Sequence, residues 1–214
     1  MIEAVVKILA AYLLGGVMGG DLMRRLFGGA DLRESGSGNV GATNALRTRG
    51  AGFALGVLAI DVGKGVLAAL ALPALPWPLH AAPAPASLGY LCGLAAVLGH
   101  CYPVFAGFRG GKGVATFLGV FGALLPAALP WMLGAFALTV MLTGYVALAS
   151  LCAAIAAVAQ VAVLGSGALS PAGWFALAML GLLAFKHRGN FVRIAAGEEH
   201  RFEKAMVLRR WRGR

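Results

Sequence analysis

Long apolar runs separated by short polar loops make up most of the chain. The runs are rich in Leu and Ala and lack the alternation of polar and apolar positions that a membrane barrel requires. Because a helix needs about 20 apolar residues to cross a bilayer, the pattern predicts an all-α, polytopic integral membrane protein. The expected helices cover residues 3–23, 51–72, 88–105, three segments within 113–164, and 172–185.

The apolar run over residues 113–164 is too long for two helices and is interrupted twice. Pro126 and Pro130 break it once, because proline cannot continue a helix. The region around Gly144 breaks it again. Three helices follow from these breaks, the first two of them short, so seven transmembrane helices are expected in all.

The loops divide into a basic set and an uncharged set. Residues 24–50, 107–113 and the tail 186–214 hold nearly every Arg and Lys, whereas residues 73–87 and the turn 165–171 hold none. Basic loops collect on the cytoplasmic face of a membrane. Seven helices then place the N-terminus outside and the C-terminus in the cytoplasm.

Composition agrees with a membrane protein of one domain, residues 1–214. The chain is 60% hydrophobic and 12% charged, whereas soluble domains carry about a quarter charged residues. The net charge of +10 is explained by the cytoplasmic loops, so nucleic acid is not an expected partner. Residues 4–17 resemble a signal peptide in length, but no cleavage site follows, and a retained first helix is expected.

A glycine-rich segment lies in the middle of the apolar part of the chain. Between Lys64 and Lys186 the only formally charged residues are Arg109 and Lys112, and both lie in this segment. A charge beside hydrocarbon is costly, while glycines let backbone N–H groups approach an anion closely. The segment therefore predicts a phosphate-binding loop at a membrane face. Its candidate ligands are Arg109, Gly110, Gly111, Lys112, Gly113 and Thr116.

The first polar loop, residues 24–50, is dense in hydroxyls, amides and small residues. Such a segment can turn many donors toward one anion; the alternative is a flexible linker. Its candidate ligands are Ser37, Gly38, Asn39, Gly41, Thr43, Asn44 and Arg47. Ser37 is also a candidate nucleophile, but that role needs an adjacent base, and no histidine lies nearby in sequence.

Three further groups of residues have both a functional and a structural interpretation. His100, at the end of the helix before the glycine-rich segment, is either a site residue or a hydrogen-bonded structural histidine. Asp61 and Lys64 lie one turn apart on one helix face, so they either neutralise each other or orient a site residue. The third group follows the last predicted helix and is either a site segment or a solvated basic segment beside anionic lipid. Its candidates are His187, Asn190, Arg193 and Glu199.

These segments together resemble the bacterial membrane glycerol-3-phosphate acyltransferases that take acyl-phosphate as donor, the PlsY family. Residues 37–44 (SGNVGATN) are similar to its first motif, residues 99–105 with 110–116 to its second, and residues 187–199 to its third. The order and spacing match along essentially the whole chain. Residues 16–18 replace the Ser-Ile-Pro usual in the family, and Arg109 and Arg201 stand where lysine is usual.

The resemblance implies a seven-helix enzyme of the bacterial inner membrane with its active site on the cytoplasmic side. It implies transfer of a fatty acyl group from acyl-phosphate to the sn-1 hydroxyl of glycerol 3-phosphate. The products would be lysophosphatidic acid and phosphate, in the first acylation of phospholipid synthesis. The expected partners are both substrates, the bilayer and, as a candidate, the acyltransferase that forms acyl-phosphate. No cofactor is expected, and no metal, since no cluster of His, Asp and Glu has ligand spacing.

The expected chemistry is direct attack by the glycerol hydroxyl, without an acyl-enzyme. The residues expected to carry it are Ser37, Arg47, Lys112, His187 and Asn190. The basic side chains would hold phosphate, the hydroxyl and amide would donate hydrogen bonds, and the base is either His187 or the departing phosphate. Glu199 is expected to pair with a neighbouring arginine. A transporter of organic phosphates is the rival function, but the internal repeats typical of many transporters are not visible.

Overall fold

The computed structural model describes residues 2–76 and 86–206, and within them every regular element is a helix and none is a strand. The all-α prediction is therefore confirmed for the described part of the chain. The chain divides into two compact units, Met1–Pro126 (unit 1) and Ala127–Arg214 (unit 2). That the whole chain acts as one domain stays a prediction.

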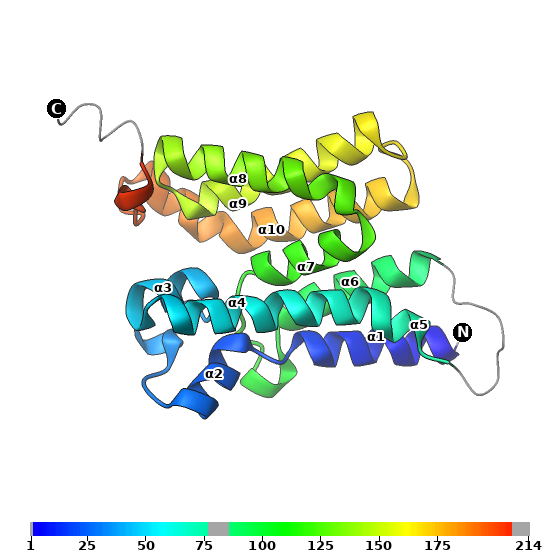
Figure 1. The fold of residues 1–214 in the computed structure, drawn as a ribbon, viewed down its shortest axis with the longest axis horizontal. Coiled ribbons are helices and arrows are strands. Elements are labelled where there is room, and N and C mark those ends of the chain that lie inside the picture. The colour runs from blue at the N-terminus through cyan, green and yellow to red at the C-terminus, as the bar shows by residue number, and fades with distance from the viewer. Residues whose placement is uncertain (1, 77–85, 207–214) are drawn as a thin grey trace. The chain divides into compact units, whose positions relative to one another are not determined.

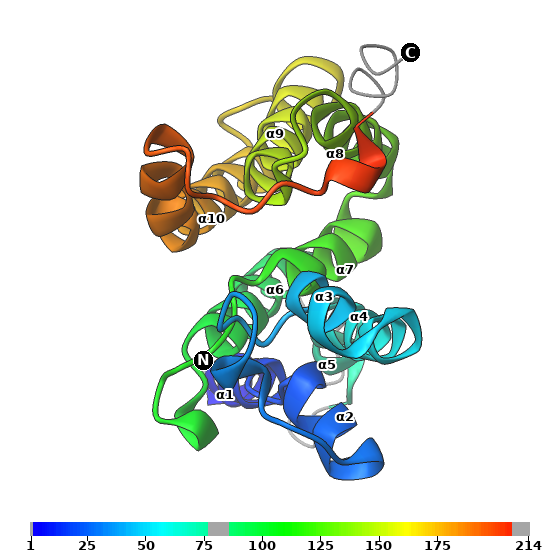
Figure 2. The ribbon, with the colours of Figure 1, turned by 90° about the vertical axis from the view of Figure 1, so that its left-hand side faces the viewer.

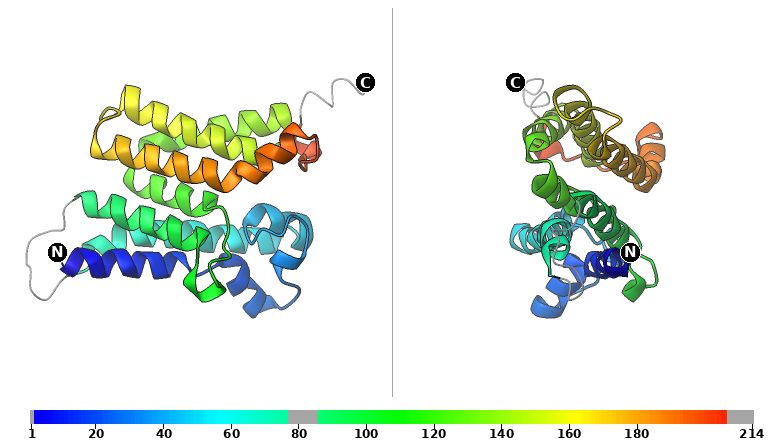
Figure 3. Two further views of the ribbon diagram at one scale, coloured as in Figure 1. Left: turned by 180° about the vertical axis from the view of Figure 1, so that it is seen from behind. Right: turned by 90° about the vertical axis from the view of Figure 1, so that its right-hand side faces the viewer.

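Unit 1 contains four neighbouring helices with a polar region at one end. Contacts join α1 to α6, α6 to α7, and α7 to α4, whereas α2 and α3 both contact α4 and lie at the opposite end from the start of α1 (Figures 1 and 3). The bounds are α1 Ile2–Gly15, α2 Gly19–Phe27, α3 Ala42–Arg49, α4 Ala51–Val66, α5 Leu72–Ala74, α6 Ala86–Cys101 and α7 Val114–Leu124. A π-helical turn, Leu67–Ala71, joins α4 to α5, and a 3-10 turn, Val104–Ala106, follows α6.

Close helix contacts in unit 1 depend on glycine. A Cβ added at Gly15 of α1 would collide with the backbone of Ala96 in α6. A Cβ added at Gly119 of α7 would collide with the backbone of Val62 in α4. Small residues at such contacts let membrane helices pack by close van der Waals approach, since lipid provides little hydrophobic driving force between helices.

Unit 2 contains three long helices, with α9 in contact with both of the others. The bounds are α8 Leu129–Thr143, α9 Val146–Ala159 with a π-helical turn Gln160–Leu164, and α10 Pro171–Ala195. The segment after α10 runs back past the ends of α9 and α8 (Figure 2). It is held there by the N–H of Phe202, which donates to the carbonyl of Gly144 at 2.7 Å.

The helices fit a multi-pass membrane protein. Among the described residues, four helical segments are long and apolar enough to cross a bilayer: Ala51–Ala74, Ser87–Ala106, Pro126–Thr143 and Val146–Leu164. The pair α1 and α2 makes a fifth if the bent pair is counted as one span, and α7 is apolar but shorter. The predicted total of seven and the orientation of the termini are therefore not confirmed and stay predictions.

The helix predicted over residues 3–23 is broken, which corrects that expectation. α1 ends at Gly15, α2 begins at Gly19, and the two helices are bent by 50°. The cause is tertiary: the carbonyl of Val17 accepts from Lys64 Nζ at 2.7 Å, and the N–H of Gly19 donates to Asp61 Oδ1 at 3.1 Å. Two side chains of α4 thus form hydrogen bonds with the backbone groups that are left without helical partners at the break.

Two other segments are more helical than predicted. The polar loop over residues 24–50 contains α3, and the last helix continues past residue 185 to Ala195. Buried positions recur every three or four residues along α10 through Leu183, His187 and Asn190, so the buried face extends into the predicted tail. Residues 207–214 of that tail, and 77–85 of the uncharged stretch 73–87, lie outside the described residues.

Candidate functional site

The first polar loop of unit 1 is organised around the buried side chain of Asn44. Its Nδ2 lies within hydrogen-bond distance of the carbonyl oxygens of Leu32 (2.9 Å), Ser35 (3.0 Å) and Asn39 (2.8 Å). Its Oδ1 accepts the backbone N–H of Ser37 at 2.9 Å. These contacts exclude a flexible linker for this part of the loop. They place Asn44, a candidate ligand, where both ends of its amide hold the loop.

Removing this amide should loosen the loop. Asn44→Ala is expected to lower stability by about 1–2 kcal/mol, because the backbone groups that share the two amide hydrogens and the amide oxygen lose these partners and regain only part of the energy from water. Thr48→Val is the matched control, since the Thr48 hydroxyl bonds only the carbonyl of Asn44 within the same helix. Thermal unfolding in detergent measures both variants. An unchanged midpoint for Asn44→Ala would show that other contacts hold the loop.

Arg33, which the sequence did not single out, joins the two polar segments of unit 1. Its NH1 and NH2 donate to the two carboxylate oxygens of Asp21 at 2.6 and 3.0 Å. Its NH1 also lies 3.3 Å from Asp31 Oδ1, and its Nε donates to the carbonyl of Arg109 at 3.3 Å. The first loop and the glycine-rich segment are thereby tied together.

Charge pairing lowers the pKa of Asp31 and raises the pKa of Arg33. Burial alone would raise the pKa of Asp31, but the backbone N–H and the charge of Arg33 outweigh it and hold that pKa below its ordinary value of 3.8. The hydrogen bond to Asp21 outweighs burial and raises the pKa of Arg33. The stabilising contribution of ionised Asp31 is present above pH 3.8 and is lost as the pH falls through the lowered pKa.

The glycine-rich segment is a compact turn bound to the end of α6. The N–H of Arg109 donates to the carbonyl of Ala106 at 3.1 Å, and the N–H of Gly111 donates to the carbonyl of His100 at 3.0 Å. A Cβ at Gly111 would also collide with the imidazole of His100. The backbone of Gly111 was expected to bind an anion; its N–H is instead bonded within the turn.

The start of α7 remains suited to an anion. Gly113 precedes the helix with a left-handed φ of 81°, and no side chain caps the helix start. N–H groups in the first turn of a helix have no intrahelical partner and favour negative charge. Lys112 lies directly before this start with a half-buried side chain. A cation and a helix N-terminus are thus adjacent.

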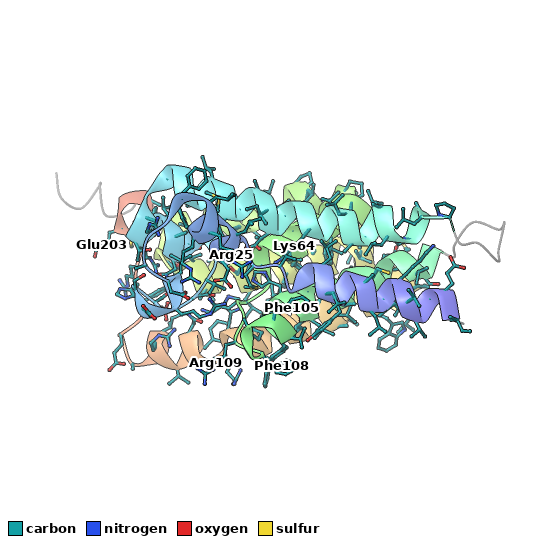
Figure 4. All side chains as sticks on the ribbon, turned by 90° about the horizontal axis from the view of Figure 1, so that it is seen from below. Arg25, Lys64, Phe105, Phe108, Arg109 and Glu203 are labelled. Carbon is teal, nitrogen blue, oxygen red and sulfur yellow. The ribbon has the colours of Figure 1, made fainter. Side chains whose placement is uncertain are left out.

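A buried polar cluster lies between the helices of unit 1. It consists of Asp61, Lys64, His100 and Thr116, each at most 3% exposed (Figure 4 labels Lys64). Lys64 Nζ donates to Asp61 Oδ1 at 2.8 Å and to the carbonyl of Val17 at 2.7 Å, and lies 2.9 Å from His100 Nδ1. The same Nδ1 lies 3.5 Å from Asp61 Oδ1, so one imidazole nitrogen meets both members of the ion pair.

This cluster connects the break in the first helix to the glycine-rich turn. Asp61 and Lys64 hold the break, and His100 holds the turn through its carbonyl while its ring packs against Gly111. Thr116 Oγ1, on α7, lies 3.3 Å from the same imidazole Nδ1. His100 and Thr116 were expected to be phosphate ligands; the structure places both in a buried cluster that supports the turn, and Asp61 and Lys64 pair with each other.

In unit 2 the third group of candidate residues lies on the last turns of α10 and in the segment that follows this helix. His187 and Asn190 are buried and Arg193 is exposed. Glu199 accepts from Asn190 Nδ2 at 2.9 Å and from Arg193 Nε at 2.8 Å. One carboxylate therefore orients both side chains.

The tautomer of His187 follows from one contact. Its Nδ1 lies 2.8 Å from the carbonyl of Leu183. A carbonyl only accepts, so Nδ1 carries the hydrogen, and in the neutral ring Nε2 has the lone pair. Nε2 is the atom of this residue that can act as a base.

A latch that the sequence did not reveal holds the segment containing Glu199. Arg201 Nε donates to the hydroxyl of Tyr145 at 2.8 Å, and its guanidinium lies 4.8 Å from the centre of that ring. The two residues are 56 positions apart, and no local pattern connects them. The latch ties the end of unit 2 to the turn between α8 and α9.

The other candidates lie at the surface of unit 1. Some of them are exposed (Ser37, Gly38, Arg47 and Arg109), and the others are partly buried (Asn39, Gly41, Thr43, Gly110 and Lys112). Three basic side chains and several hydroxyl, amide and N–H donors lie at this surface and can bind an anion. Within residues 2–76 and 86–206, no group of three or more His, Cys, Asp and Glu side chains is arranged to hold a metal ion.

Comparison with known proteins gives consistent matches along the chain. Residues 5–197 match the family model described as glycerol-3-phosphate acyltransferase. The glycerol-3-phosphate acyltransferase of Jannaschia sp. (strain CCS1) is 44% identical, over 92% of this chain and 91% of the relative. That of Zymomonas mobilis subsp. mobilis (strain ATCC 31821 / ZM4 / CP4) is 42% identical, over 92% of this chain and 95% of the relative.

Solved structures are similar as well. A crystal structure of PlsY (YgiH), an integral membrane glycerol 3-phosphate acyltransferase, in its glycerol 3-phosphate form has a TM-score of 0.79 and 36% identity. The match covers 93% of this chain and 95% of that chain. The lysophosphatidic acid form has a TM-score of 0.77 and 35% identity, over 92% of this chain and 94% of that chain.

Proposed function

This chain belongs to the glycerol-3-phosphate acyltransferase family, and from that premise we propose that it transfers a fatty acyl group from acyl-phosphate to the sn-1 hydroxyl of glycerol 3-phosphate. The products are lysophosphatidic acid and phosphate. The resemblance seen in the sequence motifs is confirmed at the level of the family, which places the chain in phospholipid synthesis. The acyl donor and the acylated position belong to the proposal.

One observation carries the proposal: the adjacent cation and helix start at Lys112 and α7, with exposed Arg47 in the same unit. Both proposed substrates carry phosphate, and such groups bind phosphate through charge and N–H donors. Acyl-phosphate is an activated mixed anhydride, so the enzyme mainly positions two anions and stabilises developing charge. The solved forms of PlsY with glycerol 3-phosphate and with lysophosphatidic acid support this substrate and product.

The proposed reaction is a single displacement at the acyl carbon. The sn-1 hydroxyl oxygen of glycerol 3-phosphate bonds to the acyl carbonyl carbon, and the bond from that carbon to the phosphate oxygen breaks. Phosphate departs with the electron pair, and the hydroxyl proton passes either to Nε2 of His187 or to the departing phosphate. No cofactor takes part in this step.

The side chains have distinct proposed roles. Lys112 and Arg47 hold phosphate; Ser37, Thr43 and Asn190 donate hydrogen bonds. Further donors come from two backbone segments and one side chain. They are the first loop at Gly38, Asn39 and Gly41, the turn at Arg109, Gly110 and Gly113, and Arg193. Asn44, His100, Thr116, Asp61, Lys64 and Glu199 position these groups through the contacts described above.

The proposal includes the topology. Seven segments cross the bacterial inner membrane, with the N-terminus outside and the C-terminus and the active site on the cytoplasmic side, in one functional domain. The bias of Arg and Lys toward alternate loops supports this orientation. The enzyme that forms acyl-phosphate is the candidate partner, because it supplies a reactive lipid-soluble substrate.

The donor can be tested directly with purified protein in lipid vesicles. Palmitoyl-phosphate with glycerol 3-phosphate should give lysophosphatidic acid and an equal amount of phosphate, while palmitoyl-CoA should give no product. Chromatography of the lipid and assay of phosphate measure both. Formation of lysophosphatidic acid from palmitoyl-CoA would contradict acyl-phosphate as the specific donor. If neither donor gives product and the vesicles take up glycerol 3-phosphate, the protein is a transporter.

The role of Ser37 separates direct attack from an acyl-enzyme. Ser37→Ala should retain turnover with a fall of about tenfold, because one hydrogen bond to substrate is lost. Ser35→Ala is the control, since its hydroxyl bonds only the carbonyl of Asp31 at 3.5 Å. Steady-state rates measure both, and complete loss of turnover in Ser37→Ala would favour an acyl-serine.

The base is tested with His187→Gln. Unchanged turnover of this variant across pH would remove His187 as the base.

A further inference from the structure

The turn between α6 and α7 contributes Arg109 and the glycines after it to the proposed reaction, whereas its apolar side chains have no role there. Val104, Phe105 and Phe108 are 44%, 71% and 59% exposed. Phe105, Phe108 and Arg109 lie together on this turn, away from Lys64 among the helices (Figure 4). Exposed apolar side chains gathered in one short turn indicate a surface that meets something other than water.

Phe108 is held there against its backbone preference. Its φ is 61°, and among the described residues it is the only residue other than glycine with a positive φ. A left-handed conformation disfavours a bulky side chain, and such strain persists where the surroundings compensate for it. Burial within the protein does not compensate, because the ring is 59% exposed. Hydrogen bonds of the turn hold the backbone: the N–H of Phe108 donates to the carbonyl of Pro103, and the N–H of Arg109 donates to the carbonyl of Ala106. The turn thus keeps the ring of Phe108 exposed to its surroundings.

The position of the turn identifies what this surface meets. The apolar span Ser87–Ala106 ends inside the turn, so Phe105 belongs to its last residues and Phe108 follows directly. Aromatic side chains are favourable at the level where acyl chains meet headgroups. The exposed guanidinium of Arg109 comes next, and a basic group at this level attracts anionic lipid. The surface is thus continuous with a membrane span and complementary to an anionic headgroup.

We propose that this turn is a lipid-binding anchor: Val104, Phe105 and Phe108 insert at the boundary of headgroups and acyl chains, and Arg109 binds the headgroup of an anionic phospholipid. The turn can hold a fixed depth because it is rigid. Phe108 N–H donates to the carbonyl of Pro103 at 2.9 Å, and Arg33 holds the carbonyl of Arg109 at 3.3 Å. Since the turn runs directly into Lys112, its depth sets the height of that side chain relative to the membrane surface.

The depth is measured with a tryptophan introduced into the turn. Phe108→Trp is placed in a chain whose four native tryptophans are replaced by phenylalanine and reconstituted in phosphatidylcholine vesicles with a minority of phosphatidylglycerol. Lipids with a quencher near the headgroup should quench the fluorescence of the Phe108→Trp variant most, and aqueous iodide least. Leu138→Trp, on the exposed middle of a span, should respond to deep quenchers, and Glu34→Trp, in an exposed polar loop, to iodide.

The Phe108→Trp variant also tests whether the turn prefers an anionic headgroup. Quencher-labelled phosphatidylglycerol should be enriched around position 108 by roughly fivefold over equally labelled phosphatidylcholine, and Arg109→Gln should abolish the preference. Iodide quenching equal to that of the Glu34→Trp control would overturn the proposal. So would quenching at the depth of the Leu138→Trp control, or protection from every quencher, which would mean that protein covers the turn. Equal quenching by both lipids would overturn the role of Arg109.

A second pair of variants tests the strain. Phe108→Gly relieves the backbone and removes the ring, whereas Phe108→Ala removes the ring and keeps the strain. In detergent, Phe108→Gly should therefore unfold at a higher temperature than Phe108→Ala. Equal midpoints would show that the backbone at 108 is not strained, and would remove the strain as an argument that the ring is kept exposed for a contact.

Discussion

Replacing Asp61 with alanine should destabilise unit 1 by about 3–5 kcal/mol, because it leaves a buried ammonium without its counter-charge. Lys64 Nζ is 2.8 Å from Asp61 Oδ1, and both side chains are at most 3% exposed. The remaining partners of the ammonium would be the carbonyl of Val17 and Nδ1 of His100, neither of which carries a negative charge. The midpoint of thermal unfolding in detergent measures the loss.

The double variant Asp61→Ala with Lys64→Met distinguishes a lost charge pair from a lost side chain. It should be more stable than Asp61→Ala alone, since no unpaired charge remains. Asp21→Asn is the surface control and should lose less than about 1 kcal/mol, because the pair it forms with Arg33 is partly exposed to solvent. A double variant no more stable than the single one would show that the pair is not coupled as the distances indicate.

Replacing Lys112 with methionine should lower kcat/KM about 10²- to 10³-fold, the usual loss when a preorganised charge that stabilises the transition state is removed. Methionine keeps the length and apolar stem of the side chain, so the turn should stay folded. Lysophosphatidic acid formed from palmitoyl-phosphate and glycerol 3-phosphate measures the rate. The unfolding midpoint, measured in parallel, should change little.

Two further variants show whether position matters in addition to charge. Lys112→Arg keeps the charge and should recover part of the rate, though less than wild type, because a planar guanidinium is not equivalent to an ammonium. Arg25→Gln removes an exposed positive charge on α2 of the same unit and should leave the rate unchanged. An equal fall for Arg25→Gln and Lys112→Met would indicate a general effect of net charge, and would remove the local role of Lys112.

Local chemistry explains why most helices were predictable. The second apolar helix begins at Ala51 as expected. Pro126 marks the break between α7 and α8, and Gly144, with a left-handed φ of 75°, ends α8 where a break was predicted. Proline lacks an N–H and glycine tolerates positive φ. These are properties of single residues, so they are visible without the fold.

Long-range contacts explain where prediction failed. The break after Gly15 depends on Asp61 and Lys64, whose contacts with Gly19 and Val17 span 42 and 47 positions. The extension of α10 could have been read from the spacing of its buried residues, but the polar His187 and Asn190 hid that period. Arg33 and its contact with Arg109 left no local signal at all.

From the sequence alone the membrane environment, the helical class and the family could be determined, because these depend on composition, spacing and motif; the polar candidates for the site stay predictions. The tertiary structure decided which polar groups hold the fold and where the others lie. Asn44, His100 and the N–H of Gly111 bond to other parts of unit 1, and Lys112 lies directly before the start of α7. The reason is physical: a buried donor must have an acceptor, and here the acceptors are supplied by distant parts of the chain.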